Sequence, residues 1–118
     1  KRKLMLGDSG LSANPDLVFR DGLAVGDVKY RQLQRDWNRT DLNQVVTFAT
    51  AFGAKRCGLF GFVLSEGAPR PREVPVGTVR ANCFAWVAAD SLDPKRSAEL
   101  LTEAVAKWLP ESLAVPDR

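Results

Sequence analysis

One apolar segment most constrains how this chain can fold. Residues 57–64 are apolar almost throughout and include Leu59, Phe60, Phe62 and Val63. A run of this length without polar alternation is typical of a strand that is buried on both faces of a sheet. Parallel strands need a crossover connection, which is usually a helix. The sequence therefore predicts a layered α/β or α+β domain with residues 57–64 as a buried strand.

The segments around this run supply the remaining elements of such a fold. Apolar spacing and capping residues predict two helices, from Thr40 or Asp41 to about Phe52 and from a cap at Ser91 or Asp93 to a stop before Pro110. Further strands are predicted at residues 3–6, 17–19, 23–30 and 78–88, with a hairpin turn at Asp21-Gly22 and loops at 31–39 and 66–75. The last helix is predicted to bury a stripe formed by Leu100, Leu101, Ala104, Val105 and Trp108. This order predicts a mixed central sheet flanked by helices.

Length and composition narrow the class of protein. The 118 residues suit one domain over residues 1–118, and a first residue other than Met also suits a C-terminal piece of a longer protein. No apolar run approaches the roughly 18 residues of a membrane span, so no membrane partner is expected. Cys57 and Cys83 both lie in apolar runs, which favours buried thiols and a cytoplasmic location. The absence of His and of clustered Cys excludes a structural zinc site and His-based catalytic dyads.

Three charged residues stand at the start of or on predicted strands, where apolar side chains would be usual. Asp16 precedes one strand of the predicted hairpin, and Asp27 and Lys29 lie on the other. A tight hairpin brings both carboxylates to the same end of the strand pair, and i, i+2 spacing places Asp27 and Lys29 on one face. Two converging carboxylates are suitable ligands for Mg²⁺, and a neighbouring Lys can orient a water or stabilise a phosphate oxygen. The alternative is a set of ordinary solvated surface charges.

The basic segment that follows predicts contact with a polyanion. Residues 1–89 carry 13 basic and 8 acidic side chains. The nucleic-acid-binding candidates next to the predicted metal site are Tyr30, Arg31, Arg35, Trp37 and Arg39. Basic side chains interleaved with an aromatic ring can contact phosphates and stack on a base or sugar. The alternative is a solvated loop with Trp37 packed on the core.

Three stretches of the sequence resemble a known family. They read NPDLVF at residues 14–19, GDVKYR at 26–31 and DLNQ at 41–44. Together they are similar to the PD-(D/E)XK nuclease signature, and most of all to the McrC nuclease subunit of 5-methylcytosine-specific restriction systems. The resemblance covers roughly residues 11–62. It implies a restriction-endonuclease-like fold and Mg²⁺-dependent hydrolysis of DNA phosphodiester bonds, with Mn²⁺ as a substitute.

The resemblance also implies roles for individual residues and partners. Asp16 and Asp27 would bind the metal together with the backbone carbonyl of Val28, Lys29 would be the catalytic lysine, and Gln44 would face the site from the helix. The implied partners are DNA and a McrB-like motor NTPase, and a homodimer is left open. The implied setting is a restriction or phage-defence system.

Two departures from the family pattern leave an alternative function open. Phe48 stands where the family usually has Tyr. Folds of this family also carry a helix before the first strand, often with a Glu that completes the metal site, and this helix is expected to lie before Lys1. The alternative is a catalytically inactive domain of the same fold that binds DNA or docks a partner subunit. A third alternative is an ordinary α/β domain whose Asp and Lys are surface charges.

Overall fold

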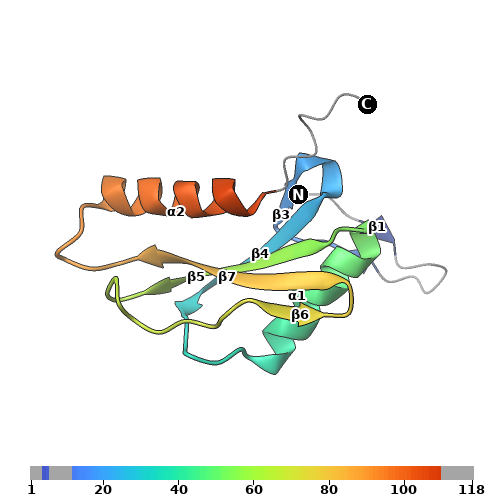
Figure 1. Ribbon diagram of the computed structural model, residues 1–118, viewed down its shortest axis with the longest axis horizontal. Coiled ribbons are helices and arrows are strands. Elements are labelled where there is room, and N and C mark those ends of the chain that lie inside the picture. The colour runs from blue at the N-terminus through green and yellow to red at the C-terminus, as the bar shows by residue number, and fades with distance from the viewer. Residues whose placement is uncertain (1–3, 6–11, 110–118) are drawn as a thin grey trace.

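A five-stranded mixed sheet forms the centre of the domain (Figure 1). The computed structural model describes residues 4–5 and 12–109. In spatial order the strands are β3 (Leu17–Phe19), β4 (Ala24–Gln32), β5 (Arg56–Val63), β7 (Val79–Val87) and β6 (Val74–Val76). Two short segments, β1 (Leu4–Met5) and β2 (Ser12–Ala13), pair with each other in a separate antiparallel sheet. The predicted α+β class with a mixed sheet is confirmed.

Most of the predicted apolar run forms β5 (Arg56–Val63), the middle strand of the sheet, but Leu64 is exposed beyond its end and Phe60 and Phe62 are only half-buried. β5 pairs in parallel with β4 on one side and with β7 on the other, whereas the outer pairs β3–β4 and β6–β7 are antiparallel. The crossover between the parallel strands β4 and β5 is α1 (Arg39–Phe52). The predicted loop 66–75 is wrong at its end, because Val74 and Pro75 together with Val76 form the edge strand β6.

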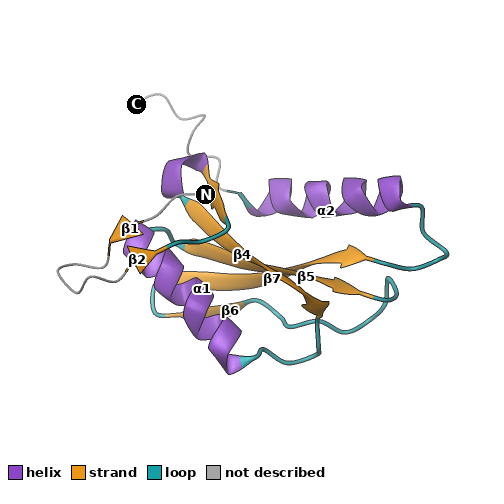
Figure 2. Cartoon of the chain, turned by 180° about the vertical axis from the view of Figure 1, so that it is seen from behind, coloured by secondary structure: helices purple, strands orange, loops and turns teal. Residues whose placement is uncertain are grey.

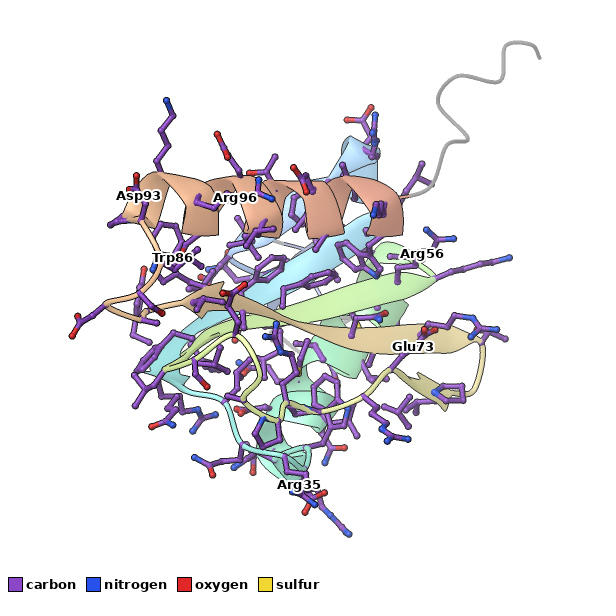
Figure 3. The ribbon with its side chains drawn as sticks, turned by 60° about the vertical axis from the view of Figure 1, so that its left-hand side comes forward. Arg35, Arg56, Glu73, Trp86, Asp93 and Arg96 are labelled. Carbon is purple, nitrogen blue, oxygen red and sulfur yellow. The ribbon has the colours of Figure 1, made fainter. Side chains whose placement is uncertain are left out.

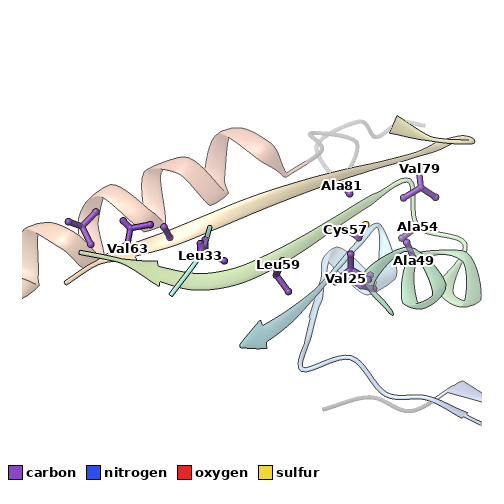
Figure 4. Close-up of a cluster of buried hydrophobic side chains, with 12 residues drawn as sticks. Val25, Leu33, Ala49, Ala54, Cys57, Leu59, Val63, Val79 and Ala81 are labelled. Carbon is purple, nitrogen blue, oxygen red and sulfur yellow. The ribbon is translucent and has the colours of Figure 1, made fainter. Parts of the chain in front are cut away.

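The first helix, α1, ends at Gly53 as predicted, but its N-terminal cap is Asn38 rather than Thr40 or Asp41, which lie inside the helix. The side chain of Asn38 accepts a hydrogen bond from the backbone N–H of Asp41 at 3.0 Å and caps the N-terminus. Gly53 ends the helix in the left-handed region with φ of 70°. Between these caps Val45 and Ala49 are fully buried and form the core with residues of the sheet, among them Val25, Cys57 and Leu59 (Figure 4).

The connection between β3 and β4 differs from the predicted two-residue turn. Residues Arg20–Gly22 form a short 3₁₀ helix in which all three residues have positive φ, 53° at Arg20, 57° at Asp21 and 96° at Gly22. Asp and Gly tolerate this region better than most residues, which explains why the Asp-Gly pair lies here. The hairpin is retained, with Leu17 opposite Gly26 and Phe19 opposite Ala24.

The second helix, α2 (Pro94–Trp108), lies on the other side of the sheet from α1 (Figures 1 and 2). The predicted cap is correct, because Asp93 Oδ1 accepts a hydrogen bond from the Lys95 N–H at 3.0 Å. The predicted buried stripe is wrong. Ala104 is exposed, and the half-buried members are Leu100, Leu101, Val105 and Trp108. The helix packs mainly against the single strand β7, so it buries only Ser97, whose hydroxyl donates to the Val87 carbonyl at 2.7 Å.

None of the helices in the described part of the chain is long and apolar enough to cross a membrane.

Candidate metal and nucleic-acid site

The hairpin of β3 and β4 brings Asp16 and Asp27 together. Leu17 is the register partner of Gly26, so Asp16 stands next to Asp27 across the two strands. The Asp16 carboxylate accepts a hydrogen bond from the backbone N–H of Val28 at 2.9 Å. It is also close enough to the Asp27 side chain to hydrogen-bond to it and to alter its pKa. The two carboxyl groups therefore converge on one point beside the peptide group that precedes Lys29.

Lys29 completes this cluster from the same face of β4. Its ammonium Nζ lies 3.0 Å from Asp27 Oδ2. Asp27 is buried, with 5% of its surface exposed. Among the described residues, Oδ2 has no hydrogen-bond partner of suitable geometry, and its close polar neighbour is the Lys29 ammonium. Burial raises the pKa of Asp27; the Lys29 ammonium opposes this shift, and the neighbouring Asp16 carboxyl adds to it.

The chemistry of these groups suits a hard divalent cation. Mg²⁺ is usually bound through one or two carboxylates, with waters and substrate phosphates as the remaining ligands. Asp16 and Asp27 supply two carboxylates, the buried Asp27 Oδ2 has the Lys29 ammonium 3.0 Å away, and Val28 adds a peptide group at the same point. Within residues 4–5 and 12–109, no three His, Cys, Asp or Glu side chains gather into a group that could hold a metal. The cluster therefore fits a cation shared by two carboxylates, with most ligands supplied by water or substrate.

An ion pair connects the end of β4 to the start of α1. The Arg31 guanidinium contacts the carboxylate of Asp41, which is buried with 4% of its surface exposed. Arg31 was predicted to contact phosphates, but its guanidinium is paired within the domain, although about half of its side chain stays exposed. Sequence reasoning missed the structural role of Asp41. The sequence did contain a signal for this ion pair. Asp41 is an acidic residue in the first turn of a helix, and it follows the basic residue near the end of β4 by ten positions.

Gln44 and Phe48 lie on α1 after this ion pair. Gln44 follows Asp41 by three positions, which places both on the same side of the helix, and it is half-buried. Phe48 packs against the hydrophobic core. The position that departs from the family pattern is therefore filled by a core side chain.

The remaining predicted nucleic-acid contacts separate into two groups. Trp37 packs against the core, and its indole N–H donates to the Arg72 carbonyl at 2.8 Å, which matches the alternative of a ring packed on the core. Arg35 and Arg39 are exposed beyond the end of β4. Tyr30 is 94% exposed and lines an apolar groove of about 540 Å³ on the face covered by α2.

Fold and site together define the class of this protein. The described residues form an α+β domain with a five-stranded mixed sheet, an α-helix on each face, and on one hairpin a cluster of two carboxylates and a lysine in which Asp27 is buried and Asp16 and Lys29 are half-buried. Comparisons with models of protein families, with curated proteins and with solved structures found no match to the chain.

Proposed function

We propose that this chain is a metal-dependent endodeoxyribonuclease domain with a restriction-endonuclease-like fold. The observation that supports the proposal most is the convergence of the Asp16 and Asp27 carboxyl groups with the Lys29 ammonium, which lies 3.0 Å from Asp27. Paired carboxylates and a lysine on adjacent strands are the groups that a phosphodiester-hydrolysing metal site needs.

Each residue of the cluster has a separate role in this proposal. Asp16, Asp27 and the Val28 carbonyl hold Mg²⁺ or Mn²⁺, which supplies an activated water and neutralises charge on the phosphate. Lys29 keeps a positive charge beside the carboxylates, where it stabilises the charge that develops on a phosphate oxygen. The role proposed for Gln44 on α1 rests on the sequence resemblance. Because burial raises the pKa of Asp27, cleavage is expected to weaken as acid protonates this carboxyl.

The proposed substrate is DNA, held through exposed basic side chains. Arg35 and Arg39 contact phosphates, and the exposed ring of Tyr30 lies beside them in the chain. The setting proposed from the sequence resemblance is a restriction or phage-defence system in the cytoplasm, with a McrB-like motor NTPase as partner. This partner would select the target.

A second candidate function is a catalytically inactive domain of the same fold that binds DNA or docks a partner subunit. The observation that favours it is the ion pair itself, because Lys29 neutralises Asp27 from within the chain. In addition, the described residues include no third carboxylate at the cluster. A domain that keeps its charges paired can bind a polyanion without hydrolysing it.

A cleavage assay with matched variants separates these candidates. The chain is incubated with plasmid DNA and Mg²⁺ or Mn²⁺, and Asp27→Asn and Lys29→Ala are compared with Asp90→Asn and Lys95→Ala, which change exposed residues elsewhere. Loss of a group that stabilises the transition state is expected to reduce cleavage by about 10²-fold or more. The controls should cleave like the parent chain. Circular dichroism verifies that all variants fold.

Two results would count against the nuclease proposal. Cleavage that persists in both Asp27→Asn and Lys29→Ala shows that the reaction does not use this cluster. DNA binding without any cleavage by the parent chain, in either metal, favours the second candidate. Binding is measured separately by fluorescence anisotropy with a labelled duplex in EDTA.

A further inference from the structure

A second cluster of charged side chains lies at the C-terminal end of α2. A groove of about 480 Å³ runs between the C-terminal part of α2 and the first residues of β5 and β7. Figure 3 shows Arg56 and Glu73 at this end of the sheet, beneath the C-terminal part of α2. The polar groups that line the groove come from β5, β7, α2 and the loop before β6. The basic ones are Arg56, Arg80 and Lys107.

Positive charge exceeds negative charge in this groove. Arg80 pairs with Glu73 at 3.0 Å, but both side chains remain solvent-exposed, at 66% and 42%. The Arg56 guanidinium donates to the Trp108 carbonyl, which fixes it at the C-terminal end of α2. Among the described residues that line the groove, Glu73 is the acidic side chain, against three basic ones. An anion that enters the groove therefore meets a net positive charge.

The floor of the groove is formed by aromatic rings and covers a buried indole N–H. Phe84 is buried and its ring contacts that of Trp108 edge to face, with 4.8 Å between centroids. The Trp108 indole Nε1 is buried and has no hydrogen-bond partner among the described residues. Asn82 adds an amide to the same wall. The indole N–H is covered, so the exposed cations and the Asn82 amide are the groups that can hold an anion in the groove, and the Trp108 ring beneath them reports on it.

We propose that this groove is a phosphate-binding site. Guanidinium, ammonium and amide N–H groups are the donors that proteins use for phosphate oxygens. The site is separate from the carboxylate cluster, because Asp27 lies on the α1 face with Val25, whereas Arg56 reaches Trp108 on the α2 face. The inference therefore does not depend on nuclease activity. The phosphate can belong to a mononucleotide or to a nucleic-acid backbone, and the experiment distinguishes these two sources.

The indole N–H signals of the full chain report on this site directly. The chain has three tryptophans, so a ¹H–¹⁵N spectrum gives three indole signals, which Trp37→Phe and Trp86→Phe assign. Inorganic phosphate, AMP and a short DNA duplex are titrated in turn, in EDTA. A saturable shift of the Trp108 signal is expected, with Trp37 and Trp86 as internal controls because neither lines the groove. A response to AMP and phosphate alone identifies the small-molecule source, and a response strongest with DNA identifies the backbone.

Matched charge variants test which side chains hold the phosphate. Lys107→Ala and Arg80→Ala remove exposed cations that line the groove, and Lys95→Ala removes an exposed cation near the start of α2. Each groove variant is expected to weaken binding about threefold to fivefold, the change that an exposed ion pair supports. With DNA, the slope of log K against log salt should also fall by about one for each lost phosphate contact. Lys95→Ala should bind like the parent chain.

Several outcomes would overturn the proposal. In the titration, these are a Trp108 signal that none of the three probes shifts, or shifts of equal size at all three indoles. Among the charge variants, the contrary outcome is that Lys95→Ala weakens binding as much as Lys107→Ala. Asp27→Asn is included because it removes the carboxylate at the other site. Unchanged binding by that variant supports a site that is independent of the carboxylate cluster, and lost binding contradicts it.

Discussion

The two faces of the sheet are covered in different ways. On one face α1 packs against β4, β5 and β7, and the fully buried residues Val25, Val45, Ala49 and Cys57 gather there. On the other face α2 packs mainly on β7 and buries only Ser97. Aromatic rings fill part of that second interface, and grooves of about 480 Å³ and 540 Å³ lie on the same side.

Because of this difference, the α1 face contributes most to the stability of the fold, and the α2 face offers the surfaces that a ligand can reach. The closely packed α1 face holds the main core and also the buried Asp27, whose surroundings are fixed by neighbouring strands and an ion pair. The α2 face leaves polar and apolar grooves open to solvent, so it offers surfaces for binding without weakening the core. Changes on the α1 face should therefore affect folding strongly, and comparable changes on the α2 face should affect it less.

The largest expected effect concerns the two thiols on the α1 face. Burial raises the pKa of both Cys57 and Cys83 from 9.0 to about 12. At a pH well below 9, the thiolate fraction of each Cys is about 10³-fold smaller in the folded protein than in the unfolded chain, because each pKa unit is a factor of ten. Iodoacetamide at pH 8, followed by mass spectrometry, should leave both thiols unmodified in the folded protein and alkylate both in urea. Because Cys83 is half-buried, Cys57 is the stricter probe, and rapid alkylation of Cys57 without urea would show that the α1 face opens readily.

The second effect compares one leucine from each face. Leu59 on β5 is 2% exposed and packs in the core, whereas Leu101 on α2 is half-buried. Leu59→Ala should lower the free energy of unfolding by about 3 kcal/mol, since it leaves a cavity in a packed core. Leu101→Ala should cost about 1 kcal/mol or less, since the site is half-exposed and Ala favours helix. Urea unfolding followed by circular dichroism measures both, and equal losses would contradict the difference between the faces.

The α1 face was also the more predictable part of the fold. The stop at Gly53 is found as predicted, and most of the apolar run at 57–64 forms β5 (Arg56–Val63), although Leu64 lies beyond the strand and is exposed. The predicted alternation over residues 23–30 is wrong, because residues 24–27 of β4 are all buried. The α2 stripe was wrong because periodicity shows which residues share a helix face but not how many strands that face covers. Here α2 covers mainly β7, so its apolar side chains stay half-exposed.

The candidate site was predictable where it depended on strand register. A short hairpin fixes which residues stand opposite each other, so the convergence of Asp16 and Asp27 followed from their spacing. The positions of Arg31 and Trp37 did not follow, because both depend on contacts with distant segments. Arg31 pairs with Asp41 on α1, and Trp37 donates to Arg72, which lies 35 residues away. Sequence patterns do not contain that information.

The third effect compares a glycine from each face. A Cβ on Gly61 would lie 2.7 Å from a buried Leu33 methyl and 3.1 Å from the Arg31 carbonyl oxygen. A Cβ on Gly26 would lie 2.8 Å from the edge of the half-buried Phe60 ring. Gly61→Ala should cost about 2 kcal/mol, because backbone and core must both shift. Gly26→Ala should cost about 1 kcal/mol, because the ring can move toward α2 and the unfolded chain loses entropy. Thermal unfolding of both variants tests this order.

The smallest effect concerns the cost of keeping Asp27 on the closely packed face. Burial raises the pKa of Asp27 above its ordinary value of 3.8, so the folded protein holds this proton more tightly than the unfolded chain. As pH rises through 3.8 the unfolded chain ionises first, and stability is lost until the pH passes the pKa of the folded state. Asp27→Asn does not titrate and should escape this loss.

The stability of Asp27→Asn relative to the parent chain should therefore increase as pH rises from 3 to 7. Urea unfolding at each pH measures the difference, with Asp90→Asn as the exposed control. A relative stability that falls with pH would show that Lys29, 3.0 Å away, stabilises the carboxylate more than burial destabilises it. The expected direction would show instead that the fold accepts a destabilising ionised carboxylate beside Asp16. A group that the fold keeps at a cost in stability is a candidate for a functional residue.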